Sequence, residues 1–122
     1  MMRADLLMSV ISNRSADMRA IILPFVLAHT GVVIAIVFGA GGLEADGVTL
    51  AVAAWAVLGS LWAMVWTDGC IQDLAAGARD LPEEMADSHM GRNYAKSPFA
   101  GFRVMNIAIV TLIVVAELMA LY

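Results

Sequence analysis

The chain has 122 residues, of which 61% are apolar and only 15% are charged. Soluble globular proteins are about 45 to 50% apolar, so this composition excludes a water-soluble monomer and indicates an integral membrane protein. The net charge is −4 and the seven Lys and Arg residues are scattered singly. Because no basic stripe is available to neutralise a phosphate backbone, we expect no nucleic-acid partner.

Residues 1–19 precede the first long apolar run and are predicted to form an N-terminal segment on the cytoplasmic side. This segment is too interrupted for a cleavable signal peptide, so we expect insertion through the first span. One side of a short amphipathic helix would carry apolar side chains (Leu6, Leu7, Val10 and Ile11). That helix would either lie on the membrane surface or pack against another amphipathic segment.

Three apolar runs are each long enough, at about 1.5 Å per residue, to cross a hydrocarbon layer of roughly 30 Å. They are residues 20–40, 48–66 and 104–122. The intervening residues 41–47 are rich in glycine and acidic residues, which is typical of a tight turn. We therefore predict an all-α integral membrane protein with three transmembrane helices, built as an antiparallel hairpin followed by a third span.

Residues 67–103 are predicted to form an amphipathic helical segment between the second and third spans. Apolar residues recur there at helical spacing (Ile71, Leu74, Ala75 and Ala78), so the second helix should continue past the membrane with an apolar face that needs a cover. Asp80, followed by Pro82 and Glu83, is typical of the N-cap of a further helix. We expect that helix to end at Gly91.

All seven cations precede the first span or lie between the second and third (Arg3, Arg14, Arg19, Arg79, Arg92, Lys96 and Arg103). The positive-inside rule then places the N-terminus and residues 67–103 in the cytoplasm and the C-terminus outside. We expect this topology in the cytoplasmic (inner) membrane of a bacterium. The lipid bilayer and either other membrane subunits or further copies of the chain are the expected partners.

Small residues recur along the predicted spans, where they allow helices to approach closely in lipid. They lie in the first span (Gly31, Ala35 and Gly39), the second (Gly59 and Ala63) and the third (Ala116 and Ala120). The pattern predicts either packing among the three helices or a face that binds another subunit.

His29 lies nine residues into the first span, about 14 Å from its inner end, where an imidazole needs a partner. One interpretation is hydrogen bonding to a hydroxyl such as that of Thr30, Ser60 or Thr111. The other is cofactor binding: a haem, chlorophyll or quinone contact that requires a partner chain, because the second histidine, His89, lies between the spans.

Glu117 lies about 21 Å into the third span by the same rise, roughly 7 Å further than His29, so direct pairing is not expected without tilt or stagger. Its carboxylate is predicted to reach water or a partner subunit near the outer interface, or alternatively to relay protons or cations.

The sequence offers no complete set of catalytic or metal-binding residues. The acidic residues between spans two and three follow no known metal-ligand spacing, so a solvated surface is expected there and no metal site. Cys70 is the single cysteine, which excludes an internal disulfide. No Ser/His/Asp triad, phosphate-binding loop or dinucleotide-binding turn is recognisable, and we therefore do not predict an enzyme.

The span count resembles that of bacterial diacylglycerol kinase, and the size resembles that of the anchor subunits of succinate dehydrogenase and fumarate reductase. The segment Trp62 to Cys70 carries neither the kinase motif nor the anchor histidines, so the likeness covers topology alone. We expect a non-catalytic accessory or anchor subunit of a larger cytoplasmic-membrane complex, such as a respiratory, photosynthetic or other redox complex. The alternatives are a cofactor-contacting subunit that uses His29 and a small homo-oligomeric transporter or pore that uses Glu117.

Overall fold

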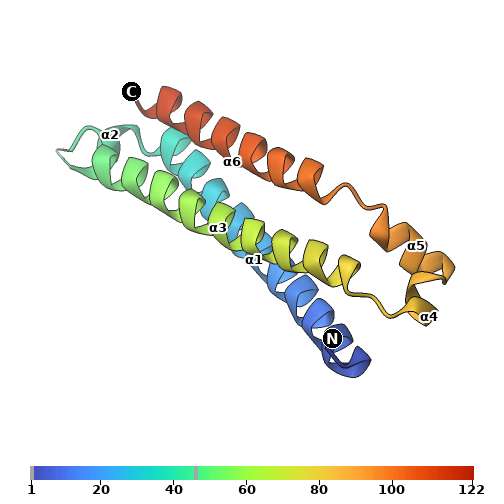
Figure 1. Cartoon of the computed structure of the whole chain (residues 1–122). Coiled ribbons are helices and arrows are strands. Elements are labelled where there is room, and N and C mark those ends of the chain that lie inside the picture. Colours follow the sequence, from blue (N-terminus) through green and yellow to red (C-terminus); the bar gives the residue numbers. More distant parts are fainter. Residues whose placement is uncertain (1, 46) are drawn as a thin grey trace.

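A computed structural model describes residues 2–45 and 47–122, and the described chain is helical apart from short connections. Three long helices dominate it (Figure 1): α1 (Ala4–Phe38), α3 (Val48–Arg79) and α6 (Phe99–Leu121). Each is long and apolar enough to cross a membrane. Short helices join them: α2 (Ala40–Leu43), and then α4 (Glu83–Ala86) and α5 (His89–Ala95). The predicted fold, an antiparallel hairpin followed by a third span, is confirmed.

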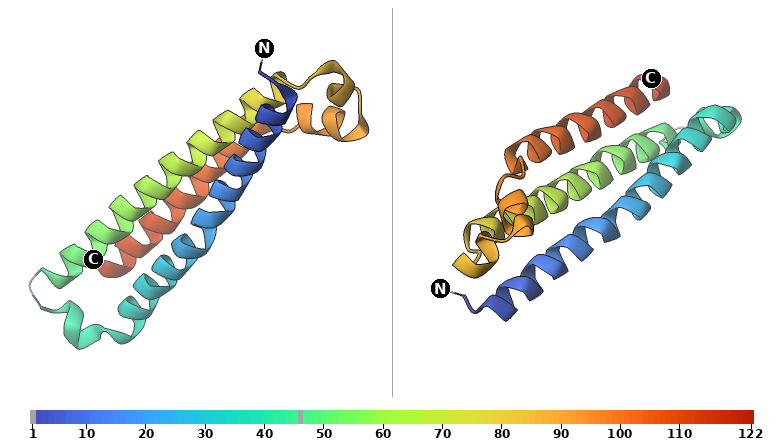
Figure 2. Two further views of the ribbon diagram at one scale, coloured as in Figure 1. Left: turned by 90° about the horizontal axis from the view of Figure 1, so that it is seen from below. Right: turned by 90° about the vertical axis from the view of Figure 1, so that its right-hand side faces the viewer.

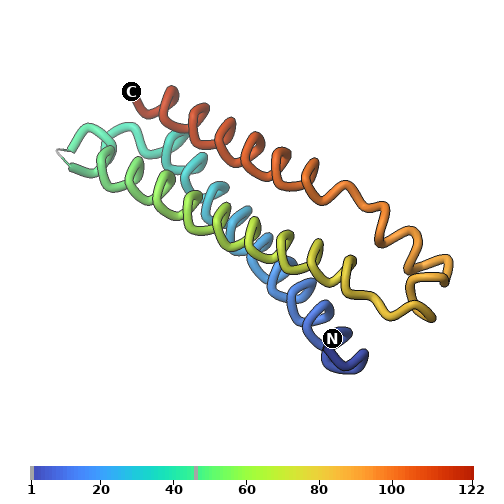
Figure 3. Tube along the Cα trace, in the orientation of Figure 1, coloured from blue at the N-terminus to red at the C-terminus, as the bar shows by residue number. Residues whose placement is uncertain are grey.

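The central helix is α3, and α1 and α6 each pack along it (Figure 2). In the tube of Figure 3, α1 crosses α3, so that its C-terminal half lies on the side of α6 and its N-terminal half on the opposite side. Small side chains line the buried face of α3 (Ala53, Ala56, Ser60 and Ala63). Such side chains let helix backbones approach closely where lipid supplies no apolar driving force.

The helices are longer than the apolar runs that predicted them. Instead of a separate segment at residues 1–19, α1 runs unbroken from Ala4 to Phe38, with Pro24 inside it. The second helix continues to Arg79, and the third begins at Phe99, five residues before the predicted span. At 1.5 Å per residue α1 is about 52 Å long, so it projects well beyond a hydrocarbon layer of roughly 30 Å.

The projecting parts of α1 and α3 pack on each other at the end of the bundle that holds the N-terminus, α4 and α5. We call this the cationic end, because the seven Lys and Arg residues lie at the N-terminal part of α1, the last residue of α3, the region of α5 or the start of α6. Leu7 is only 1% exposed. Gly77 makes the close approach possible, because a Cβ there would lie 2.9 Å from Cγ1 of Ile11. Of the two alternatives for the N-terminal segment, the structure therefore shows packing against the amphipathic face of α3.

Two ion pairs join neighbouring helices at the cationic end. The Nε atom of Arg14 on α1 lies 2.8 Å from Oδ2 of Asp73 on α3. Asp68 on α3 accepts two hydrogen bonds from the guanidinium of Arg103 on α6, at 2.6 and 3.1 Å. Each pair ties one outer helix to α3 just past the apolar run 48–66.

The connection from α3 to α6 differs in detail from the prediction. Asp80 follows the last turn of α3 and does not cap a new helix, while α4 begins at Glu83 after Pro82. Ser88 caps α5 by accepting a hydrogen bond from the backbone N–H of Gly91 at 2.9 Å. Gly91 lies inside α5 and does not end a helix; it is buried against the backbone of Met85, which leaves no room for a side chain.

Candidate functional site

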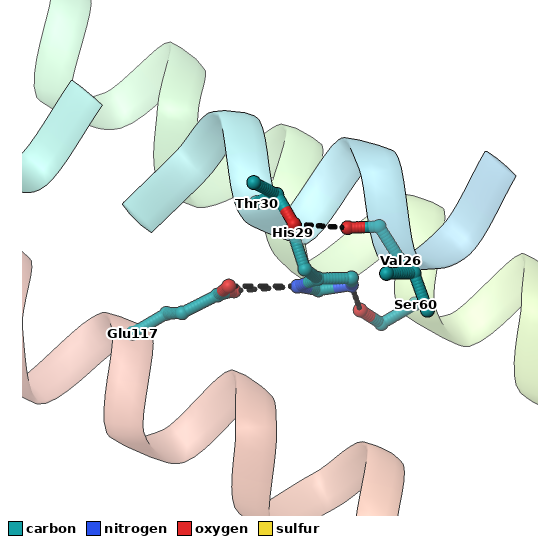
Figure 4. Close-up of polar contacts among 5 residues, drawn as sticks. All are labelled: Val26, His29, Thr30, Ser60 and Glu117. Atoms are coloured by element: carbon teal, nitrogen blue, oxygen red, sulfur yellow. Dashed lines mark hydrogen bonds and ion pairs between the residues drawn. The ribbon is translucent and has the colours of Figure 1, made fainter. Parts of the chain in front are cut away.

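Three polar side chains, one from each long helix, meet inside the bundle (Figure 4). We call His29 of α1, Ser60 of α3 and Glu117 of α6 the His29 cluster. The Nδ1 atom of His29 lies 2.7 and 2.9 Å from the two carboxylate oxygens of Glu117, and its Nε2 atom lies 2.9 Å from the hydroxyl oxygen of Ser60. The side chains of His29 and Glu117 are 12% and 5% exposed.

The local sequence around each member explains its position. On α1, the ring of Phe25 lies one turn before His29, with its centroid 4.2 Å from that of the imidazole. Thr30 points elsewhere, and its hydroxyl donates to the carbonyl of Val26 on the same helix at 2.8 Å. Ser60 belongs to the small-residue face of α3, so its hydroxyl is within reach of the imidazole. Of the three hydroxyls considered from sequence, the structure selects Ser60.

The sequence predicts that the carboxylate of Glu117 reaches water or a partner subunit, but the structure buries it beside His29, at 5% exposure. The sequence predicts pairing of the two only with tilt or stagger, and α6 is displaced along the bundle in this way. In the left view of Figure 2 its C-terminus stops short of the turn that joins α1 to α3. Beyond Glu117, α6 continues only to Leu121, whereas α1 continues from His29 to Phe38. This stagger amounts to about five residues, or roughly 7.5 Å of helical rise.

The cluster forms a closed hydrogen-bond network. With the proton of a neutral imidazole on Nδ1, His29 donates to Glu117 and accepts from the hydroxyl of Ser60. In the protonated form both ring nitrogens donate, and the serine oxygen becomes an acceptor. Across residues 2–45 and 47–122, every buried side-chain nitrogen and oxygen has a hydrogen-bond partner. The network therefore leaves no buried polar side-chain atom of the cluster without a partner.

The order serine, histidine, carboxylate is also that of a hydrolase triad, which the sequence did not reveal. Ser60, however, is 2% exposed and lies in the middle of an α-helix. The backbone N–H groups around it are used in the helix, so the triad has no adjacent donors of the kind that stabilise an oxyanion. The cluster therefore has the order of side chains of such a triad without the exposure or the oxyanion donors that attack on a substrate requires.

A groove of about 690 Å³ between α1 and α3 opens beside His29, with Trp55 and Trp62 among its lining residues. Both tryptophans are exposed. The other residues that line the groove are mainly apolar as well. A haem or chlorophyll metal would gain a nitrogen of His29 only if the ring released Ser60 or Glu117. Within the described part of the chain, no three His, Cys, Asp or Glu side chains are grouped so that they could hold a metal ion.

The small residues predicted to pack helices divide into two groups. Ala63 is buried, and Gly59, Ala35 and Gly39 are half-buried, whereas the others lie exposed on the outer surface of the bundle (Gly31, Ala116 and Ala120). The sequence reasoning missed Ala53 and Ala56, whose spacing with Ser60 and Ala63 marks one face of α3. On α6, the buried positions are Val110 and Glu117.

Two further candidates lie away from the cluster. His89 is exposed, and its Nδ1 atom is 3.1 Å from Nη2 of Arg92. Cys70 is buried at the cationic end, and this burial raises the pKa of its thiol. Neither residue contacts the His29 cluster. Comparison of the chain with known protein families, with curated proteins and with solved structures finds no match.

Proposed function

We propose that the chain is a non-catalytic accessory or anchor subunit of a larger membrane complex. The observation that carries this proposal is the closed His29 cluster. Both nitrogens of the one intramembrane imidazole, and the carboxylate of Glu117, are engaged within the chain. His29 and Glu117, the residues best suited to cofactor binding or proton transfer, thus serve to hold three helices together. A scaffold requires this kind of contact.

The outer surface supports the same proposal. Gly31 is exposed, and nothing lies within 4 Å of a Cβ built there. Ala116 and Ala120 on α6 are exposed as well. Because small residues are the positions at which helices approach each other in lipid, these sites suit contact with a helix from another subunit.

We further propose that the cationic end faces the cytoplasm of a bacterium and that the chain resides in its inner membrane, with the C-terminus outside. The support is the distribution of Lys and Arg, all of which lie beyond the apolar spans at one end of the bundle.

The test is native electrophoresis of the chain extracted from its own membranes in a mild detergent, with Gly31→Leu compared with Val33→Leu. Val33 is also exposed, at 49%, but already carries a branched side chain. Wild type and Val33→Leu should migrate as a complex much larger than the chain, and Gly31→Leu or Ala116→Leu should shift to lower mass. A wild-type chain that runs alone would refute the proposal.

A second candidate, contact with a haem, chlorophyll or quinone in a partner chain, is favoured by the groove beside His29. The visible absorption spectrum of the purified complex tests it, with His29→Ala compared with wild type. A band that moves or disappears supports cofactor contact, whereas unchanged bands remove this candidate.

A further inference from the structure

A second groove, of about 640 Å³, follows one face of α3 from the apolar span to the cationic end, where Arg14 of α1 also lines it. We call it the Arg14 groove. Its apolar part is one face of α3, which includes Leu58, Leu61 and Val65, and Trp62 and Trp66 also line it. All five side chains are exposed, at 44 to 71%. Its volume falls within the range of roughly 300 to 1,000 Å³ typical of small-molecule sites.

The other end of the Arg14 groove is polar, where Arg14 and Asp73 line it together. Asp73 lies seven residues past Trp66, about 10 Å along the helix axis. The polar headgroup layer on each side of the hydrocarbon is roughly 5 to 8 Å thick, so a helix that leaves the hydrocarbon near Trp66 places Asp73 close to the outer edge of that layer. The groove thus joins an apolar trough at acyl-chain depth to a charged pair at headgroup depth.

The charged pair combines both signs. The Nε atom of Arg14 lies 2.8 Å from Asp73, and its Nη1 atom lies 3.1 Å from Asp17 on the same helix. The side chains of Arg14 and Asp73 are 39% and 50% exposed, so each keeps surface free for a ligand. A guanidinium binds phosphate well, and a carboxylate accepts hydrogen bonds from an ammonium group.

We propose that the Arg14 groove binds one aminophospholipid of the phosphatidylethanolamine class. Its phosphate would contact Arg14, its primary ammonium would contact Asp73, and one acyl chain would lie along the trough of α3. A purely anionic headgroup would be repelled by the carboxylate of Asp73. A choline headgroup has no N–H group that could donate a hydrogen bond to that carboxylate. The combination of charges therefore favours an amine-bearing zwitterion over either.

The test is native mass spectrometry of the chain after exchange in mixed micelles that contain equal amounts of phosphatidylethanolamine, phosphatidylglycerol and phosphatidylcholine. We expect one phosphatidylethanolamine to be retained preferentially. Asp73→Asn should reduce that preference by about tenfold or more, which corresponds to the loss of one charge-assisted hydrogen bond. Asp68→Asn is the matched control, because it removes an interhelical carboxylate at a similar level that does not line the Arg14 groove.

A second variant keeps the proposal falsifiable if Asp73→Asn disturbs folding. Gly69 lines the groove, and nothing lies within 4 Å of a Cβ built there, so Gly69→Leu should fill the trough without a clash and abolish retention. Circular dichroism and thermal unfolding report whether each variant is folded. Equal retention of the three lipids, preference for phosphatidylglycerol, a second copy of the chain in place of lipid, or an equal effect of Asp68→Asn would overturn the proposal.

Discussion

His29 joins three helices through two hydrogen bonds, at a depth where an unpaired polar group is costly. The carboxylate of Glu117 is just as costly to bury alone. The contacts among His29, Glu117 and Ser60 offset the cost of burying these polar groups, because each polar side-chain atom has a hydrogen-bond partner. In membrane proteins such interhelical bonds contribute about 0.6 kcal/mol on average and about 1.7 at most.

A double-mutant cycle between His29 and Glu117 measures that contribution. We expect Glu117→Gln and His29→Asn each to destabilise the bundle, and the double variant to be less destabilised than their sum by about 0.5 to 2 kcal/mol. Stability is measured by titration with a denaturing detergent in mixed micelles. Thr30→Val is the control, because that hydroxyl bonds only within its own helix. Strictly additive effects would contradict the pairing.

The ion pair between Asp68 and Arg103 predicts a dependence of stability on pH. The hydrogen bond from Arg103 lowers the pKa of Asp68 below its usual value of about 3.9. A lowered folded-state pKa stabilises the fold above the unfolded pKa, and that stabilisation is lost as the pH falls through the folded pKa. Because the pair is partly exposed, we expect it to contribute only weakly to the free energy of unfolding.

The measurement is the difference in unfolding free energy between wild type and Asp68→Asn as a function of pH. This difference should stay constant between about pH 5 and 7 and shrink below about pH 4. Asp87→Asn, at an exposed residue of the same type, serves as the control. A difference that grows on acidification would show that the ion pair does not stabilise the fold.

The helices show which features a hydropathy pattern can predict. Apolar runs report the part of a helix that lies in hydrocarbon, so the existence and order of the three spans followed from the sequence. The helix ends did not follow from the sequence, because α1 extends N-terminally through the charged residues 14–19 by tertiary contact: Leu7 and Ile11 pack on Gly77. Helix N-termini are usually recognised by capping residues, but Arg3 makes no side-chain cap to α1.

Two neighbouring leucines test the packing of that N-terminal extension. Leu7 is 1% exposed and Leu6 is 54% exposed. Leu7→Ser should loosen α1 from α3 and raise the rate of alkylation of Cys70, which is buried nearby on α3 and has a thiol pKa raised by that burial. Leu6→Ser should leave the rate near that of wild type.

Alkylation followed by mass spectrometry gives the rate, and hydrogen exchange of residues 4–19 provides a second readout. Equal rates for the two serine variants would mean that the extension does not pack as described.

At the scale of the whole molecule, the sequence predicted the members of the candidate site but not their arrangement. The sequence singled out His29 and Glu117 as intramembrane ionisable residues and included Ser60 among the partners of the imidazole. It could not bring Glu117 to His29, because the relative height of two helices depends on the length and fold of the connection between them. Here that connection contains α4 and α5, and α5 is anchored to α3 by the hydroxyl of Tyr94, which donates to the carbonyl of Leu74 at 2.8 Å.

The proposed topology is tested by thiol labelling in a Cys70→Ala background. A cysteine at Lys96 should react only after the cytoplasmic side becomes accessible, and one at Glu44 should react from outside intact cells. Both residues are exposed, at opposite ends of the bundle. The reverse pattern would invert the topology and leave the fold unaffected.

The length of α3 determines how far the cationic end extends past the apolar run 48–66. The helix extends thirteen residues past Trp66 to Arg79, about 20 Å at 1.5 Å per residue, and α1 braces it along that distance. The unit formed by α4 and α5 is thereby attached to a rigid pair of helices and not to a flexible linker. Inserting one helical turn in both helices would move α4 and α5 about 5 Å further from the apolar run.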